Sequence, residues 1–324
     1  MERGLVSPGW LAEGLKAGNP RLRIVDATWF LPNSPFACPV EGASAEVLFA
    51  RGPRLPGARF FDLDVVADTS SGLPHMLPTG EVLAKALANM GISKESEVVV
   101  YDQLGIFSAP RFWYTLKAFG HPNVAVLDGG LPRWLQEGGE VEASQLADIT
   151  PVAVSEENWV LNPSMVWNLG QVKANVTERT AQVIDARPGG RFLGTTPEPR
   201  PGMRSGHMPG SVSVPFGDVL TTSKTMKSQE ELLKVFAGAG VLLRSPSEDG
   251  SEGWTPPFLV TSCGSGMTAA ILGLALKQLN FPIESNWALY DGSWTEYGGR
   301  SDTEIEKTEP DGEKVSVPAL EPKL

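Results

Sequence analysis

Residues 256–276 read PPFLVTSCGSGMTAAILGLAL, and this stretch decides the fold. PPFLV is a short burst of apolar, β-prone residues, whereas Met267 to Leu279 is long enough and rich enough in alanine and leucine for a buried helix. Cys263 and two glycines lie between these segments. We therefore predict a strand, a tight turn and a helix, with the cysteine in the turn.

Similar phrases recur about half a chain apart, which indicates an internal duplication. RIVDATWF around Asp26 returns as QVIDARPGGRF around Asp185, and VVVYDQLGIFSAPRFW around Asp102 returns as FLVTSCGSGMTAAILG around Cys263. LPGARFFDLD likewise returns as MPGSVSVPFGD, and VAVLDGGLPRW returns as NWALYDGSWTEY. The offset is 159 residues for the first pair and 161 for the second, so we interpret the chain as two copies of one fold.

Each copy alternates short β-branched segments with helical ones. We predict strands over 98–101, 124–127, 183–185 and 258–261, and helices over 79–90, 108–119, 228–239 and 267–279. Thr79 with Glu81 and Ser228 with Glu231 have the chemistry of helix N-termini. The alternation predicts the α/β class, with two tandem domains that each contain a mainly parallel sheet flanked by helices. Functional loops then lie at the carboxyl ends of the strands, where Cys263 is expected.

We expect an N-terminal domain over 1–140, a linker over 141–163, a C-terminal domain over 164–300 and an extended or disordered tail over 301–324. The polar segment SPSEDGSEGWTPP, residues 245–257, interrupts the second copy just before the cysteine strand. It is interpreted as a surface loop, and a lid over a substrate is the alternative.

Composition excludes several classes of protein. The net charge of −11 argues against a nucleic acid or an anionic membrane as partner, because both require a basic surface. Two distant cysteines and three scattered histidines predict neither a disulfide framework nor a metal site, and no cofactor is expected. No apolar run is long enough to span a membrane, and the N-terminus does not resemble a targeting segment. We expect a monomer in the cytosol, or in the mitochondrion if a transit segment has been removed.

A glycine-rich turn before a helix points several backbone N–H groups at one spot, beside the positive end of the helix dipole. A thiol at that spot loses its proton more easily, which makes Cys263 a candidate nucleophile. Cysteine-dependent phosphatases need an arginine after five intervening residues, and that position is Ala269. Sulfur transfer through a persulfide is the other chemistry that fits a reactive cysteine in such a turn, and an inert buried cysteine is the alternative.

Taken together, these motifs resemble the two-domain sulfurtransferases of the rhodanese superfamily, in particular the members that take sulfur from 3-mercaptopyruvate. The similarity spans about residues 5–300. It rests on FFDLD (60–64), HMLP (75–78), YDQLGIFSAPRFW (101–113), LDGG (127–130), GRF (190–192), PEPR (197–200), GHMPGSVSVPF (206–216), CGSGMT (263–268) and YDGSW (290–294).

The resemblance implies that Cys263 becomes a persulfide and passes its sulfur to a thiol, such as that of thioredoxin, or to cyanide. Thiosulfate-preferring rhodaneses have arginine and lysine where this chain has Gly264 and Ser265, and an uncharged loop suits a dianion poorly. Two arginines are expected to hold the carboxylate and the ketone of mercaptopyruvate, and they match Arg191 and Arg200.

The remaining site residues also follow from the resemblance. A relay of Ser265, His75 and Asp64 would deliver a proton to the departing enolate, although a structural role for the histidine is an equal alternative. Three further loop residues complete the predicted substrate site, namely Gly266, Met267 and Thr268.

The first copy has Asp102 in place of the nucleophile, so it is expected to be non-catalytic, and Cys38 is expected to be incidental. Arg111, in the corresponding loop of the first copy, is expected to pack between the domains. A thiosulfate:cyanide sulfurtransferase, a phosphatase of the same fold and a non-catalytic binding module remain as alternatives.

Overall fold

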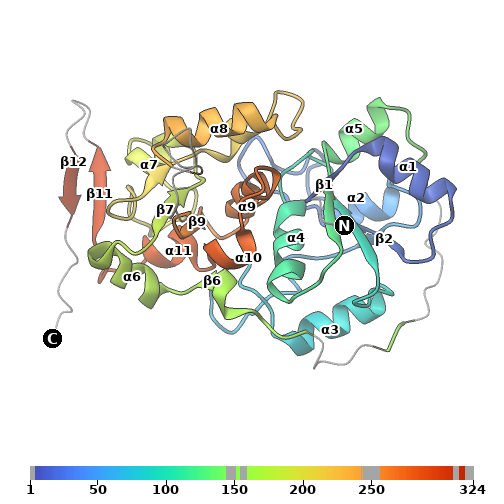
Figure 1. Ribbon diagram of the computed structural model, residues 1–324, viewed down its shortest axis with the longest axis horizontal. Coiled ribbons are helices and arrows are strands. Elements are labelled where there is room, and N and C mark those ends of the chain that lie inside the picture. The colour runs from blue at the N-terminus through green and yellow to red at the C-terminus, as the bar shows by residue number, and fades with distance from the viewer. Residues whose placement is uncertain are drawn as a thin grey trace, which may run out of the picture. The chain divides into compact units, whose positions relative to one another are not determined.

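The computed structural model describes residues 4–143, 151–153, 159–241, 243, 256–308 and 314–317 (Figure 1). Its contacts divide the chain into two compact units. Unit 1 holds the described residues within Met1–Thr69, Leu77–Asn162 and Leu220–Met226, and unit 2 holds those within Ser70–Met76, Pro163–Val219 and Lys227–Leu324.

Unit 1 is built on a five-stranded parallel sheet with the strand order β1-β5-β4-β2-β3. Apolar β-branched runs form its central strands, which are buried except at the starts of β2 and β4. The strands are β1 (Leu5–Val6), β2 (Leu22–Asp26), β3 (Arg59–Phe60), β4 (Glu97–Tyr101) and β5 (Val124–Leu127). The helices are α1 (Pro8–Lys16), α2 (Ala45–Arg51), α3 (Gly80–Asn89), α4 (Ala109–Ala118) and α5 (Gly130–Gln136).

Unit 2 repeats this plan in the order β6-β10-β9-β7-β8, again with parallel pairing throughout. The strands are β6 (Val166–Trp167), β7 (Gln182–Asp185), β8 (Val212–Ser213), β9 (Leu259–Ser262) and β10 (Trp287–Tyr290). The helices are α6 (Leu169–Glu178), α7 (Gly189–Leu193), α8 (Gln229–Gly238), α9 (Ala269–Gln278), α10 (Ile283–Asn286) and α11 (Ser293–Tyr297), with 3₁₀ turns at Pro163–Met165 and Phe216–Val219. Since the two strand orders correspond one to one, the predicted duplication and the α/β class are confirmed.

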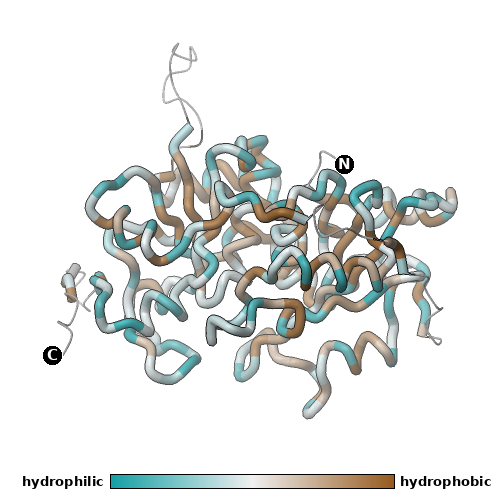
Figure 2. The backbone as a smooth tube through the Cα atoms, turned by 90° about the horizontal axis from the view of Figure 1, so that it is seen from below, coloured by the Kyte–Doolittle hydropathy of each residue, from teal (hydrophilic) through white to brown (hydrophobic). Residues whose placement is uncertain are grey.

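Local signals placed the predicted helices within one or two residues of their observed ends. The Thr79 side chain accepts a hydrogen bond from the Val82 amide at 3.3 Å, and Ser228 forms a reciprocal capping box with Glu231. In Figure 2, brown hydrophobic stretches run through the interior of each unit, and teal gathers on the outer turns. Each unit therefore buries its own core.

Each half of the chain also lends a short segment to the unit formed by the other half. Ser70–Met76 belongs to unit 2, and Leu220–Met226 belongs to unit 1. Both segments contain a non-glycine residue with a left-handed backbone, His75 with φ 63° and Lys224 with φ 59°. A Cβ at Gly105 would lie 2.5 Å from Cβ of Lys224, so only glycine fits beneath this segment in unit 1.

The tail after Arg300, expected to be extended or disordered, carries an antiparallel ribbon of β11 (Ile305–Thr308) and β12 (Lys314–Val317). Glu306 exchanges two backbone hydrogen bonds with His207, and Ile305 is buried. In the expected linker, Trp159 is buried against His121, while residues 144–150 and 154–158 lie outside the described part. Residues 245–255 of the expected insertion also lie outside it, so both interpretations of that segment stay predictions.

Candidate active site

The turn after β9 places Cys263 at the carboxyl end of the central strand of unit 2, as predicted. Its side chain is 2% exposed. The start of α11 holds the turn, because the Cys263 amide donates to Ser293 Oγ at 3.2 Å and the Cys263 carbonyl accepts from the Trp294 amide at 3.0 Å. The Thr295 amide donates to the Gly264 carbonyl at 2.8 Å. The backbone around the thiol is therefore fixed by another element.

The loop from Cys263 to α9 contains the other predicted residues of the CGSGMT motif. Gly266 has a φ of 78°, which lets the chain turn back toward the helix. Met267 is buried, and Thr268 stands at the N-cap position of α9, although its side chain makes no capping hydrogen bond. The motif thus forms a compact turn whose amides precede a helix.

Asp102 shows what the same turn does in unit 1. Its carboxylate is fully buried and accepts hydrogen bonds at 2.9 Å from the amides of Leu104, Phe107, Ser108 and Ala109. Burial raises the pKa of this carboxyl even though the four amides act in the opposite direction. The turn of unit 1 therefore directs four backbone amides at an acceptor that follows the end of its central strand.

The duplication maps those four donors onto the loop after Cys263. Counted from the strand end, Leu104 corresponds to Ser265. Counted from the helix start, Phe107, Ser108 and Ala109 correspond to Met267, Thr268 and Ala269, because this loop is one residue shorter in unit 2. Among the described residues, the amides of Ser265, Thr268 and Ala269 donate to no protein acceptor, whereas Ala270 donates weakly to the Met267 carbonyl at 3.4 Å. These three amides lie in the loop that joins Cys263 to α9 or at the first residue of that helix.

His75 lies beside this loop, because its segment belongs to unit 2. Its Nδ1 is 2.9 Å from Ser265 Oγ, and both side chains are buried. A left-handed backbone at a non-glycine residue costs free energy, so the surrounding structure holds the histidine in this position. The structure brings these two members of the predicted relay together.

Asp64, the third predicted member, belongs to unit 1. It is exposed, its Oδ2 accepts a hydrogen bond from Trp29 Nε1 at 3.0 Å, and its amide donates to Asp62 Oδ1 at 2.8 Å. With Cys38 it lines a cavity of about 490 Å³ in that unit. Its part in a relay stays a prediction.

Arg191, on the short helix α7, approaches the cysteine loop from the side. A Cβ at Gly264 would lie only 3.1 Å from Arg191 Nη2, so the guanidinium packs directly on the glycine backbone. Arg191 is held by Glu198, whose Oε2 accepts from both Nε and Nη2. Arg200 lies nine residues further along the chain, in the same connection after α7, and is half-buried.

Behind Arg191 lies a buried chain of charges that sequence reasoning did not identify as part of the site. Arg187 donates from Nη1 to Glu198 Oε1 at 2.7 Å and from Nη2 to Asp185 Oδ2 at 2.6 Å, and its guanidinium lies 4.1 Å from the centre of the Trp294 ring. Burial alone would lower the pKa of Arg187, but the two carboxylates outweigh it and the pKa is raised. The two carboxylates therefore stabilise the charged form of the buried Arg187.

Signals for this cluster were present in the motifs. Asp185 and Arg187 belong to the repeated QVIDARP phrase, and Glu198 belongs to PEPR. Their mutual pairing depends on the fold of residues 185–198 around α7, which the phrases do not specify.

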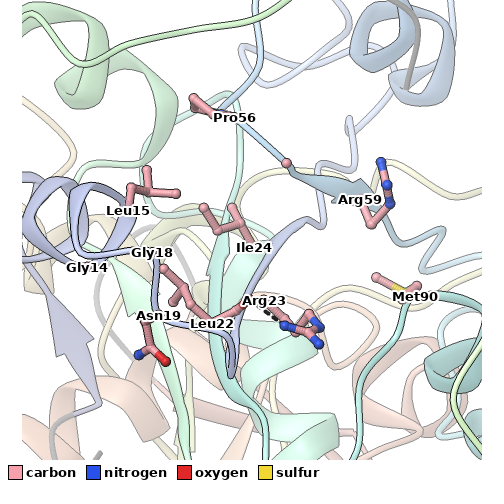
Figure 3. A pocket seen from close by; sticks show the side chains of 11 residues that line it. Gly14, Leu15, Gly18, Asn19, Leu22, Arg23, Ile24, Pro56, Arg59 and Met90 are labelled. Atoms are coloured by element: carbon pink, nitrogen blue, oxygen red, sulfur yellow. Dashed lines mark hydrogen bonds between the residues drawn. The ribbon is translucent and has the colours of Figure 1, made fainter. Parts of the chain in front are cut away.

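Figure 3 shows a cavity of about 160 Å³ in unit 1, bordered by Leu15, Arg23, Arg59 and Met90, and it contains none of the predicted site residues. Within the described part of the chain, no group of three or more His, Cys, Asp or Glu side chains is arranged to bind a metal ion. No helix of the described residues is long and apolar enough to cross a membrane.

Comparisons by family, by sequence and by structure all find rhodanese-like proteins or sulfurtransferases that are similar to this chain. Residues 7–137 match the model of the rhodanese-like domain. The chain is 39% identical to thiosulfate/3-mercaptopyruvate sulfurtransferase 1, mitochondrial, of Arabidopsis thaliana, over 94% of this chain and 78% of that protein. It is 37% identical to 3-mercaptopyruvate sulfurtransferase of Escherichia coli K12, over 93% of this chain and 97% of that protein. The crystal structure of SseA from Escherichia coli, a 3-mercaptopyruvate sulfotransferase, superposes with a TM-score of 0.73 at 34% identity, covering 90% of this chain and 99% of that one.

Proposed function

Because the chain belongs to the rhodanese family of sulfurtransferases, we propose that it moves a sulfane sulfur from 3-mercaptopyruvate through a Cys263 persulfide to an acceptor thiol or cyanide. One observation carries the proposal: the thiol stands in a turn whose copy in unit 1 holds the Asp102 carboxylate with four amides. We infer that amides of the corresponding loop in unit 2 donate hydrogen bonds to the persulfide sulfur after transfer.

The first half-reaction forms the persulfide. The Cys263 thiolate attacks the sulfur of mercaptopyruvate, an S–S bond forms and the C–S bond breaks. The electron pair of that bond passes to the methylene carbon, which leaves the enolate of pyruvate. Ser265, in contact with His75, is proposed to hand a proton to the carbon as pyruvate forms, with Asp64 as the third member of this relay.

The second half-reaction returns the enzyme to its starting state. The acceptor attacks the outer sulfur, the S–S bond breaks and Cys263 leaves as a thiolate. The backbone of the loop after Cys263 surrounds the transferred sulfur in both steps. The loop residues with this role are Gly264, Gly266, Met267 and Thr268. Arg191 and Arg200 are proposed to hold the donor carboxylate and ketone, since a planar guanidinium matches a carboxylate with two parallel hydrogen bonds.

Thiosulfate is the second candidate donor, because the Arabidopsis relative is named for both compounds. The acceptor, whether thioredoxin, another thiol or cyanide, belongs to the same proposal. The compartment is also part of the proposal: it is the cytosol or the mitochondrion, and the name of the Arabidopsis relative includes the mitochondrion.

The proposed function is tested by the intact mass of the protein after exposure to mercaptopyruvate without acceptor. A gain of one sulfur atom that dithiothreitol removes is expected in the wild type and not in Cys263→Ser. A wild type whose mass stays unchanged, while pyruvate is still released, would assign the reaction to another mechanism.

A further inference from the structure

We propose that Glu198 is a positioning residue that makes the site prefer a sulfur donor with one negative charge over a donor with two. This inference rests on the proposed function. Its carboxylate is 1% exposed and lies between two guanidinium groups, with Oε1 on Arg187 and Oε2 on Arg191. A buried carboxylate shared in this way fixes both cations in orientation and cancels one positive charge beside the cysteine loop.

The orientation follows from which nitrogens are engaged. Glu198 takes the edge of the Arg191 guanidinium formed by Nε and Nη2, and none of the hydrogen bonds described for the chain uses Nη1. The end formed by Nη1 and Nη2 is thus available for a ligand carboxylate. Nη2 also packs on Gly264, next to the nucleophile, so Glu198 holds that end at the loop.

The charge effect follows from the balance of the cluster. Asp185 and Glu198 carry two negative charges, and Arg187 and Arg191 carry two positive ones. Arg191 is the most exposed of the four at 14%, while the other three are at most 2% exposed, so the negative charges are screened little by water. Glu198 therefore repels a second negative charge on a donor more strongly than it affects a single carboxylate.

Glu198→Gln separates these effects from simple loss of structure. The amide retains the shape and one acceptor oxygen, and Arg187 keeps Asp185 as its partner. The site then gains one positive charge. We expect the ratio of kcat/KM for thiosulfate to kcat/KM for mercaptopyruvate, with cyanide as acceptor, to rise roughly tenfold.

Two companion variants sharpen the test. Glu198→Asp keeps the charge but is one methylene shorter and cannot span both guanidinium groups; its KM for mercaptopyruvate should rise while the donor ratio stays constant. Glu230→Gln on α8 removes an exposed glutamate that pairs with Lys234 and should change neither quantity. A donor ratio that is unchanged in Glu198→Gln, or that changes equally in Glu198→Asp, overturns the proposal.

A binding measurement distinguishes this failure from failure of the proposed function. In a Cys263→Ser background, calorimetry with pyruvate as the monoanion and sulfate as the dianion measures charge preference without turnover. Glu198→Gln should tighten sulfate binding roughly tenfold relative to pyruvate. An unchanged ratio refutes the role of Glu198 even if the enzyme transfers sulfur as proposed, and a changed ratio upholds it even if the donor proves to be another anion.

Discussion

Asp26, at the end of β2, allows a quantitative test of how a buried carboxylate without a counterion among the described residues affects the free energy of unfolding. The corresponding residue of unit 2 is Asp185. In unit 1 its carboxylate accepts hydrogen bonds from the Thr28 amide at 2.9 Å, from the Thr28 hydroxyl and from the Gln103 side-chain amide at 3.3 Å. Burial outweighs these neutral donors and raises the pKa of Asp26 from 3.8 to about 6. Its counterpart Asp185 instead pairs with Arg187.

The sign of the effect on stability follows from the raised pKa. The native state binds the proton of Asp26 more tightly than the unfolded chain, so this contribution is complete below about pH 3.8 and is lost as the pH rises through about 6. The two values correspond to roughly 3 kcal/mol between acid and neutral pH. Asp26→Asn is neutral throughout and keeps an acceptor for Thr28, while Gln103 can turn its own amide to match.

We therefore expect the free energy of unfolding of Asp26→Asn, relative to wild type, to rise by roughly 3 kcal/mol from about pH 3 to about pH 7. Urea denaturation of both proteins at unit steps of pH measures this difference, and other carboxylates cancel from it. Asp185→Asn is the matched control: it removes one of the two carboxylates paired with the buried Arg187 and should destabilise the protein at neutral pH by about 3 kcal/mol. A wild-type-minus-variant difference for Asp26 that is constant over this range would refute the reasoning.

The remaining predictions concern the proposed chemistry. Cys263→Ser should abolish turnover with every donor while the circular dichroism spectrum stays native, whereas Cys38→Ser should keep most activity; equal behaviour of the two would reject the assigned nucleophile. Arg191→Lys should lower kcat/KM for mercaptopyruvate about 10- to 100-fold, because an ammonium group cannot form the two parallel hydrogen bonds of a guanidinium with a carboxylate. Unchanged kinetics would show that this residue does not bind the donor. The double change Gly264→Arg with Ser265→Lys should shift preference toward thiosulfate in a salt-dependent way, and a constant donor ratio in the folded variant would contradict it. Position 264 has no left-handed backbone, so the cost of its side chain is displacement of Arg191 Nη2, 3.1 Å from the new Cβ.

Much of the fold could be predicted because its signals are local. The helix that follows Ser228 is specified by its capping box, and β9 is specified by a short apolar run. Because of the duplication, a signal recognised in one copy also predicts the other copy. Asp102 and Cys263, for example, directly follow corresponding strands. The tail was harder, because β11 pairs with His207, about a hundred residues earlier in the chain, and its own composition is polar.

The candidate site divides in the same way. Cys263 and its glycine-rich turn follow from the sequence alone, since a strand, a turn and a helix in succession place the thiol at a sheet edge whatever surrounds them. The partners of that turn depend on contacts distant in sequence: His75 comes from a segment that joins the other half of the chain, and Arg191 is aimed by Glu198 and the buried Arg187. The helix and strand propensities of residues act over a few neighbouring positions. The contacts of His75 and Arg191 instead depend on the pairing of buried charges and on which unit a segment such as Ser70–Met76 joins. Only the packed tertiary structure, in which each buried ion must find a counterion or hydrogen-bond partner, determines those choices.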